Sequence, residues 1–223
     1  METFLYIFII LFIMGKLEKI RQKIIDELKC PLKDAATNIV FGKGSSKAAI
    51  LFIGEAPGNK EDLVGMPFVG SAGKKLDKLL QSIGLTLKEV YIANILKYRP
   101  PKNRDPSPSE IVSHTPYLIE QIKVIKPKII ATLGNFSSKF VLSGFSVEGM
   151  KKIEGVGKLH GQIIDVKIGR MKFKVVPLYH PAATMYRPKL RPVLEEDFWT
   201  MGKFLKKEIG HKLPRRVKQN TLI

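Results

Sequence analysis

Residues 48–58, AAILFIGEAPG, place a short continuous apolar run directly before a turn rich in glycine and proline. An apolar run of this length that ends in glycine is typical of a strand buried on both faces of a parallel sheet. Parallel α/β sheets bind their ligands beyond the carboxyl ends of the strands. The turn Gly54–Gly58 is therefore the first candidate for a functional site.

Three further apolar runs have the same character, at 90–96 (VYIANIL), 128–133 (KIIATL) and 173–178 (FKVVPL). Helical patterns accompany them at Lys16–Leu28, Ser71–Ile83, 108–125, Phe136–Leu142 and Pro192–Lys207, and the third of these begins with a capping-box pattern at Ser107 and Glu110. The glycine-rich stretch Gly144–Gly169 is expected to form loops with a hairpin. This alternation predicts an α/β fold with three αβα layers and a central four-stranded, mainly parallel sheet.

The 223 residues indicate one domain, 15–210, with an extension at each end. Phe4–Met14 (FLYIFIILFIM) is almost wholly apolar, but it is shorter than the ~20 residues that span a bilayer and lacks the basic start of a signal peptide. We interpret residues 1–14 as a start-site artefact; a short anchor and a docked apolar tail are the alternatives. Residues 211–223 form a basic tail that we expect to be frayed.

Charge and cysteine content narrow the class of protein. Lys and Arg number 38 against 20 acidic residues, for a net charge of +18. Such a field favours a polyanionic partner, most commonly nucleic acid; an anionic membrane surface and a simple lysine bias are the alternatives. The single cysteine, Cys30, excludes an internal disulfide framework and suits a reducing, cytoplasmic location.

Distinctive residues follow each predicted strand: Gly54–Gly58, Asn94, Gly134 and His180. Phe68 lies in a loop flanked by proline and glycine, where it is a candidate platform for a planar base or, alternatively, a core plug. The turn after the first strand is neither a Walker loop nor a GxGxxG fingerprint.

Five ordered motifs resemble family 4 of the uracil-DNA glycosylase superfamily, the thermostable prokaryotic type. They are Gly54–Gly58, Glu61-Asp62, Pro67–Gly73, residues 94–106 (NILKYRPPKNRDP) and residues 180–183 (HPAA), and the resemblance runs from about residue 30 to residue 204. It implies a monomeric enzyme that flips uracil out of single- or double-stranded DNA. Hydrolysis of the N-glycosidic bond would leave an abasic site for base excision repair.

The resemblance also implies a role for each matching position. Phe68 would stack on uracil, Asn94 would read its O4 and N3–H edge, and Glu61 would wall off the C5 position. Gly54 and the main chain around Glu55 and Ala56 would hold the O2 side. His180 would donate to O2 as negative charge develops on the leaving base, and Glu55 is the second candidate catalytic residue. Because Ala56 stands where some other glycosylase families have aspartate, we expect dissociative cleavage without a covalent intermediate.

Contacts to DNA are expected from two loops and a helix start. Tyr186 would fill the gap left by the flipped base, and Arg187 would meet a phosphate. Further phosphate candidates are Arg99, Lys102, Arg104 and Ser137. For each basic residue, a solvated surface charge is the alternative.

One departure from the family concerns its four-iron–four-sulfur cluster, usually held by four cysteines. The matching positions here are Glu27, Cys30, Tyr98 and His114, which is not a plausible ligand set for that cluster. We therefore predict that no cofactor is bound. The alternatives to an active enzyme are a non-catalytic DNA-binding paralogue and an unrelated Rossmann-like nucleotide-binding enzyme.

Overall fold

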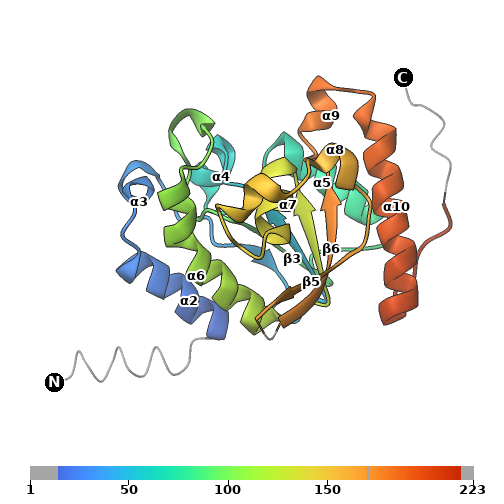
Figure 1. Ribbon diagram of the computed structural model, residues 1–223, viewed down its shortest axis with the longest axis horizontal. Helices are drawn as coiled ribbons and strands as arrows, with labels where there is room; N and C mark the ends of the chain where they lie inside the picture. Colours follow the sequence, from blue (N-terminus) through green and yellow to red (C-terminus); the bar gives the residue numbers. More distant parts are fainter. Residues whose placement is uncertain (1–14, 170, 217–223) are drawn as a thin grey trace.

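The computed structural model describes residues 15–169 and 171–216. Its centre is a six-stranded sheet with the strand order β1-β3-β2-β4-β6-β5 (Figure 1). The inner strands β2 (Ile50–Gly54), β3 (Val90–Asn94), β4 (Ile129–Leu133) and β6 (Met171–Leu178) run parallel. They confirm the four strands that the apolar runs predict.

Two antiparallel edge strands widen the sheet beyond the predicted four. They are β1 (Lys43–Gly44), which pairs with β3, and β5 (Ile164–Ile168), which pairs with β6. Neither has a continuous apolar run, because β1 is two residues long and β5 alternates half-buried with exposed side chains. The α/β class and the three layers are as predicted.

The helices include the five that periodicity predicts and four short ones that it does not. In chain order they are α2 (Lys16–Glu27), α3 (Pro31–Ala35), α4 (Asn59–Val64), α5 (Ser71–Ser82), α6 (Pro108–Ile125), α7 (Asn135–Leu142), α8 (Val156–Leu159), α9 (Ala183–Tyr186) and α10 (Leu190–Ile209), with 3₁₀ turns η1 (Pro101–Asn103) and η2 (Gly149–Lys152). Helices α3, α4, α8 and α9 have only four to six residues each, too few for a helical period to emerge.

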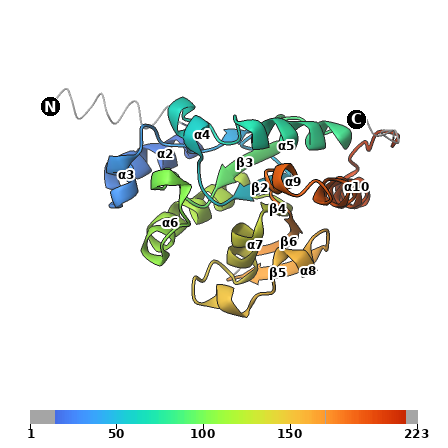
Figure 2. The same ribbon diagram turned by 90° about the horizontal axis from the view of Figure 1, so that it is seen from above.

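Helices cover both faces of the sheet (Figure 2). Successive residues of β2 show the two-residue period of a strand: Leu51 and Ile53 pack into the core shared with α2, α6 and α7, and Ile50 and Phe52 into the core shared with α5 and α10. The Phe52 ring stacks on Phe198 of α10 with 6.1 Å between centroids. Burial on both faces explains why the inner strands are apolar throughout.

The start of α6 shows how sequence dictates local structure. Ser107 caps the helix, and the Glu110 carboxylate accepts from the Ser107 main-chain N–H, which completes the predicted capping box. The Arg104 guanidinium also donates twice to Glu110, at 2.9 and 2.5 Å. This contact lowers the pKa of Glu110 to about 2.

Only one of the two ends of the chain can be compared with its expectation. The apolar run Phe4–Met14 lies outside the described residues, and among the helices that are described none is long and apolar enough to cross a membrane. At the other end, His211 Nε2 lies 2.7 Å from the Ile83 carbonyl oxygen, and the Arg216 guanidinium lies over the Trp199 ring. Residues 211–216 are therefore docked against α10 and the end of α5 rather than frayed as expected, and the rest of the basic tail, 217–223, lies outside the described residues.

Candidate active site

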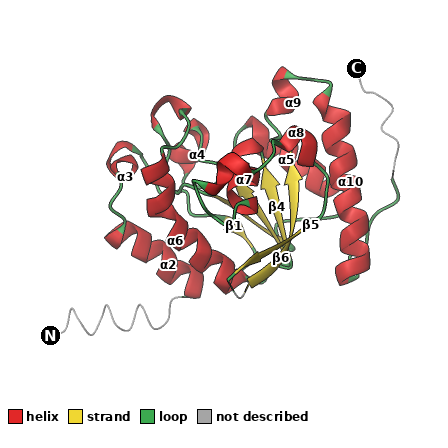
Figure 3. Cartoon of the chain, viewed as in Figure 1, coloured by secondary structure: helices red, strands yellow, loops and turns green. Residues whose placement is uncertain are grey.

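The ends of β2 and β3 bring the first two candidate residues together. Gly54 pairs with Asn94 in the parallel register, and the inner strands point towards the end of the molecule where α4 and α9 lie (Figure 3). A methyl group added to Gly54 would overlap the side-chain oxygen of Asn94 and would lie 3.0 Å from two carbons of the Phe68 ring. Only glycine lets these two side chains converge at the strand end.

Phe68 reaches this point from the loop between α4 and α5. Its ring is buried, with 6% of the residue exposed, and its main chain has a φ of 52°. A left-handed conformation costs a non-glycine residue roughly 1–2 kcal/mol, so the surrounding contacts must impose it. One of these contacts is Glu61, whose Oε1 accepts hydrogen bonds from the main-chain N–H groups of Val69 (3.0 Å) and Gly70 (2.8 Å). Glu61 therefore organises the loop, and its role beside C5 of a pyrimidine stays a prediction.

Asn94 is 2% exposed, yet its side-chain carbonyl oxygen has no hydrogen-bond partner among the described residues. A buried acceptor without a partner costs about 1–3 kcal/mol, and native structures contain few of them. The main-chain carbonyl of Asn94, by contrast, accepts from the Lys97 ammonium at 2.7 Å. The Asn94 backbone is thus held while its side-chain oxygen is left available.

His180 follows β6 and completes the group. Its Nδ1 accepts from the main-chain N–H of Ala182 at 3.2 Å, which leaves the proton of a neutral ring on Nε2. Burial lowers the pKa of His180 to about 4, so the ring is neutral at pH 7. Its centroid lies 5.7 Å from that of Phe68, with 31° between the planes. The site therefore offers a neutral N–H donor beside an aromatic face.

Glu55 is the one carboxyl group in the turn that follows β2. Burial, and then the negative charge of Asp105, raise its pKa to about 7. The Glu55 carbonyl oxygen accepts from the Leu96 N–H, which ties the turn to the end of β3. A half-buried carboxyl that titrates near neutrality is suited to proton transfer or to holding a water molecule.

Some side chains predicted to contact DNA are exposed, and others already form hydrogen bonds within the protein. Tyr186 of α9 is 81% exposed, and Arg187 and Lys102 are also exposed. Arg99 donates to Asn59 and Asn103, and the Arg104 guanidinium binds Glu110, so both basic groups already hold loop structure.

Ser137 requires a correction. It is fully buried, and its hydroxyl donates to the Gly134 carbonyl oxygen at 3.3 Å. A phosphate on the surface cannot reach this hydroxyl. The helix-start position that made Ser137 a candidate serves the packing of α7 against β4, where the neighbouring Ser138 hydroxyl lies 2.9 Å from that of Thr132.

The four positions that match the family's cluster ligands do not fit such a cluster. Glu27 is exposed, whereas Cys30, Tyr98 and His114 are buried, and the Tyr98 and His114 rings meet edge to face at 6.2 Å. Iron–sulfur clusters require thiolate ligands, and Cys30 is the chain's one cysteine. Across 15–169 and 171–216, no three side chains from His, Cys, Asp or Glu are grouped as metal ligands would be.

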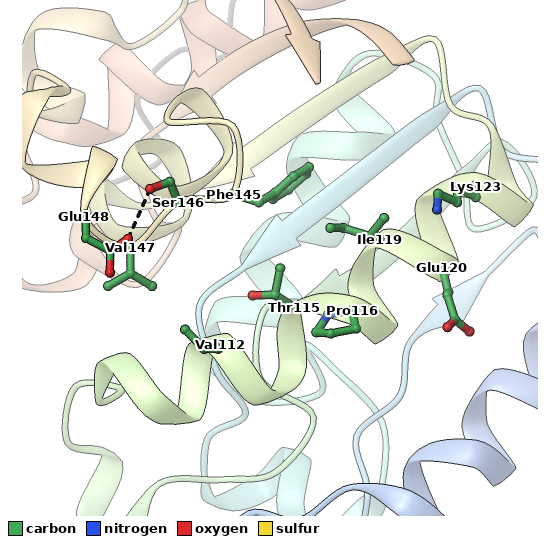
Figure 4. Close-up of a pocket in the computed structure, with 10 residues that line it drawn as sticks. All are labelled: Val112, Thr115, Pro116, Ile119, Glu120, Lys123, Phe145, Ser146, Val147 and Glu148. Atoms are coloured by element: carbon green, nitrogen blue, oxygen red, sulfur yellow. Dashed lines mark hydrogen bonds between the residues drawn. The ribbon is translucent and has the colours of Figure 1, made fainter. Parts of the chain in front are cut away.

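The open groove in Figure 4 lies away from these residues. It runs between α6 and residues 145–148 and contains none of the candidate site residues. The site is therefore assigned from the convergence of Gly54, Phe68, Asn94 and His180.

Two lysines that contact the main chain of the site are missed by sequence reasoning. Lys97 Nζ bonds the Asn94 carbonyl oxygen, and Lys43 Nζ bonds the Phe68 carbonyl oxygen at 2.9 Å. Lys97 lies inside the motif at residues 94–106, and its place between Leu96 and Tyr98 was the available signal. Lys43 lies in a two-residue strand with no pattern of its own.

Comparison with known proteins identifies the family of this chain. The family described as "Uracil DNA glycosylase superfamily" matches residues 41–204. The type-4 uracil-DNA glycosylase of Archaeoglobus fulgidus is 44% identical over 87% of this chain and 96% of its own length. Those of Sulfurisphaera tokodaii (46% identical, 83% of each chain) and Thermotoga maritima (39% identical, 80% of this chain and 89% of its own) are also similar. The chain belongs to the uracil-DNA glycosylase superfamily.

Proposed function

We propose that this protein is a monofunctional uracil-DNA glycosylase that hydrolyses the N-glycosidic bond of a flipped-out uracil in DNA. The family and the names of its type-4 relatives support this activity. The net charge of +18 supports DNA as the partner. The abasic site that remains is the product that base excision repair begins from.

The observation that carries the proposal is the unpartnered oxygen of Asn94. Uracil offers an N3–H donor beside its O4 acceptor, which is the pattern that a carboxamide oxygen and its neighbouring NH₂ group satisfy together. Cytosine presents an acceptor at N3 and a donor at its exocyclic position, so it would leave the Asn94 oxygen unpaired. A buried polar group that only the correct base satisfies is an effective means of discrimination.

Phe68 and His180 supply the remaining contacts to the base. The Phe68 ring stacks on the pyrimidine face, and His180 Nε2–H donates to O2 as negative charge moves onto the leaving base. Because the ring is neutral, it stabilises that charge without giving up a proton. One well-placed donor of this kind lowers the activation free energy by about 3–4 kcal/mol.

Glu55 acts on the sugar side of the reaction. Its carboxylate, formed as the pH rises through about 7, stabilises the oxocarbenium-like sugar and holds the water that completes hydrolysis. Direct hydrolysis by water forms no covalent bond between enzyme and sugar, so no Schiff base and no lyase activity are expected. Tyr186, exposed on α9, enters the duplex where the base has left.

We further propose that the enzyme works as a monomer in the cytoplasm and without an iron–sulfur cluster. The mixed set of Glu27, Cys30, Tyr98 and His114 supports the last point. Iron and acid-labile sulfide assays on protein purified without oxygen are expected to give far less than one iron per chain. A cluster with four irons per chain would overturn this part of the proposal.

One assay tests the activity. Labelled single- and double-stranded oligonucleotides with one uracil are incubated with the protein, and abasic sites are then cleaved with alkali. Wild type is expected to give the shortened product. The rate of uracil release should fall about 10²–10³-fold in His180→Ala and in Asn94→Ala. It should be unchanged in His211→Ala, the matched histidine control outside the site. A wild-type protein that binds these oligonucleotides but releases no uracil would instead be the non-catalytic paralogue.

A further inference from the structure

Phe68 keeps a conformation that its sequence does not favour. It is a non-glycine residue with a φ of 52°. Residues of this kind persist only where surrounding contacts determine the main chain. The contacts at the Phe68 peptide therefore decide where its ring points.

The Phe68 carbonyl oxygen is held by Lys43. This lysine lies in the edge strand β1, opposite Ile92 of β3, and its Nζ donates to the carbonyl oxygen at 2.9 Å. The side chain is half-buried; burial lowers the pKa of Lys43, while the nearby carboxylates of Asp77 and Glu61 act to raise it. A surface lysine whose head group was solvated would show neither the burial nor the main-chain contact.

Opposite charges hold the two sides of the Phe68–Gly70 segment. Lys43 bonds the carbonyl at Phe68, and the Glu61 carboxylate bonds the N–H groups of Val69 and Gly70. Gly73 completes the arrangement, because a methyl group there would overlap the Phe68 carbonyl. The first turn of α5 thus lies directly against the peptide that Lys43 bonds.

We propose that Lys43 is a positioning residue for base stacking, because its ammonium, bonded to the Phe68 carbonyl, fixes the strained main chain that directs the Phe68 ring towards Asn94 and His180. This inference rests on the proposed function. It assigns a role in the uracil site to a side chain that touches neither the base nor the sugar. Lys43 reaches the site from the sheet edge beyond β3.

Positioning of a stacking ring has a distinct kinetic signature. Phe68 contacts the uracil ring equally before and during bond cleavage, so a misplaced ring weakens the binding of both states. Loss of Lys43 should therefore raise KM with little change in kcat. A general loss of folded protein would lower the apparent kcat and leave KM unchanged.

The test compares Lys43→Met with Lys47→Met, a matched loss of charge at an exposed lysine in the same segment. Steady-state uracil release from a single-stranded oligonucleotide is expected to show KM raised roughly tenfold in Lys43→Met, kcat within about threefold of wild type, and Lys47→Met like wild type. In a Phe68→Leu background, the same Lys43→Met change should have less than about twofold effect, because the ring it positions is gone.

Chemical rescue tests the same point without relying on the stability of one variant. In Lys43→Cys, alkylation with 2-bromoethylamine converts the thiol to a thioether that carries an ammonium at lysine length. Cys30, the other thiol, is 8% exposed, and alkylated wild type is the control. Alkylation is expected to return KM to within about threefold of wild type.

The outcomes separate the two proposals. An inactive wild type overturns the proposed function, and this inference falls with it. With an active wild type, a KM for Lys43→Met equal to that of Lys47→Met, an undiminished effect in the Phe68→Leu background, or alkylation without recovery of KM would each overturn the role of Lys43 alone.

Discussion

Residues 95–97 connect the proposed base site to a second group of buried side chains, Cys30, Tyr98 and His114, which we call the Cys30–Tyr98–His114 cluster. Each region contains a buried polar atom without a hydrogen-bond partner, but the surroundings of the two atoms differ. At the proposed base site, the unpartnered oxygen of Asn94 lies near the Phe68 ring, whose centroid is 5.7 Å from that of His180. In the cluster, the unpartnered Nε2 of His114 lies in a fully buried ring next to Tyr98. We propose uracil as the partner of the first atom, whereas the neighbours of the second atom indicate no ligand.

A buried polar atom without a partner is therefore informative only together with its surroundings. Both atoms cost stability in the free protein. Removing the first should abolish function and spare the fold, whereas removing the second should spare function and improve the fold. Substitutions of Asn94, Glu55 and His114 test the two sides of this contrast, and a substitution of Lys97 tests the residue that links the two regions.

The largest effect is expected from Asn94→Leu, which removes both hydrogen-bonding groups and keeps a similar volume. Uracil release should fall about 10³-fold or more, because N3–H and O4 lose their partners. The free energy of unfolding should stay equal or rise by about 1 kcal/mol, since a buried orphan is gone. Single-turnover uracil release and urea unfolding measure the two quantities. A variant that retains a tenth of the wild-type rate would refute the reading role of Asn94.

Lys97 links the two regions and gives the next largest effect. It is fully buried, burial lowers its pKa to about 7, and its charge in turn lowers the pKa of His114. Between pH 7 and 10 the unfolded chain binds a proton that the folded chain lacks, so stability should rise with pH. The difference in free energy of unfolding between wild type and Lys97→Met should change by on the order of 4 kcal/mol across that interval.

Urea unfolding of both proteins at several pH values measures this difference. Other titrating groups cancel, because the two chains differ only at Lys97. A constant difference between pH 7 and 10 would mean that the buried amine stays charged in the fold.

Glu55→Gln tests the second proposed catalytic group with a smaller effect. In wild type, kcat should increase as the pH rises through about 7, because the carboxylate is the active form. The amide variant should lose roughly ten- to a hundredfold in kcat and should lack this limb of the profile. His180, with a pKa near 4, leaves the comparison undisturbed above about pH 5. An unchanged profile in Glu55→Gln would assign the limb to another group.

The sequence predicts the strands of the site and the residues at their ends better than it predicts the side chains that hold those residues in place. The inner strands and the residues at their ends are readable because burial on both faces leaves continuous apolar runs and because parallel strands end at one edge. That Gly54, Asn94 and His180 converge follows from this rule, whereas Phe68 joins them from the loop between α4 and α5. The family resemblance supplies their roles in the reaction, which the pattern alone does not.

What the sequence leaves out depends on three-dimensional contacts of single groups. Lys43 and Lys97 are two among many lysines, and only the fold distinguishes them from solvated ones. Ser137 is misread for the converse reason, since its place near a helix start does not reveal that it is buried and bonded to the Gly134 carbonyl oxygen. The docking of residues 211–216 on α10 is likewise a tertiary effect, carried by His211, Leu213 and Arg216 rather than by any local pattern.

The smallest effect is expected from His114→Leu, the counterpart of Asn94→Leu in the cluster. His114 Nδ1 lies 2.7 Å from the Glu110 carbonyl oxygen, while Nε2 is unpartnered, and burial lowers the pKa of the ring to about 4. Leucine removes the orphan and the Nδ1 contact together, and the contact to a helix carbonyl is worth less than the orphan costs. The free energy of unfolding at pH 7 should therefore rise by about 1 kcal/mol, and uracil release should stay within twofold of wild type. As the pH falls through 6.5 towards 4, the unfolded chain binds a proton that the folded chain does not, so wild type should lose stability that His114→Leu keeps. A drop in uracil release with stability unchanged would show instead that the Cys30–Tyr98–His114 cluster belongs to the reaction, and the contrast between the two regions would then be false.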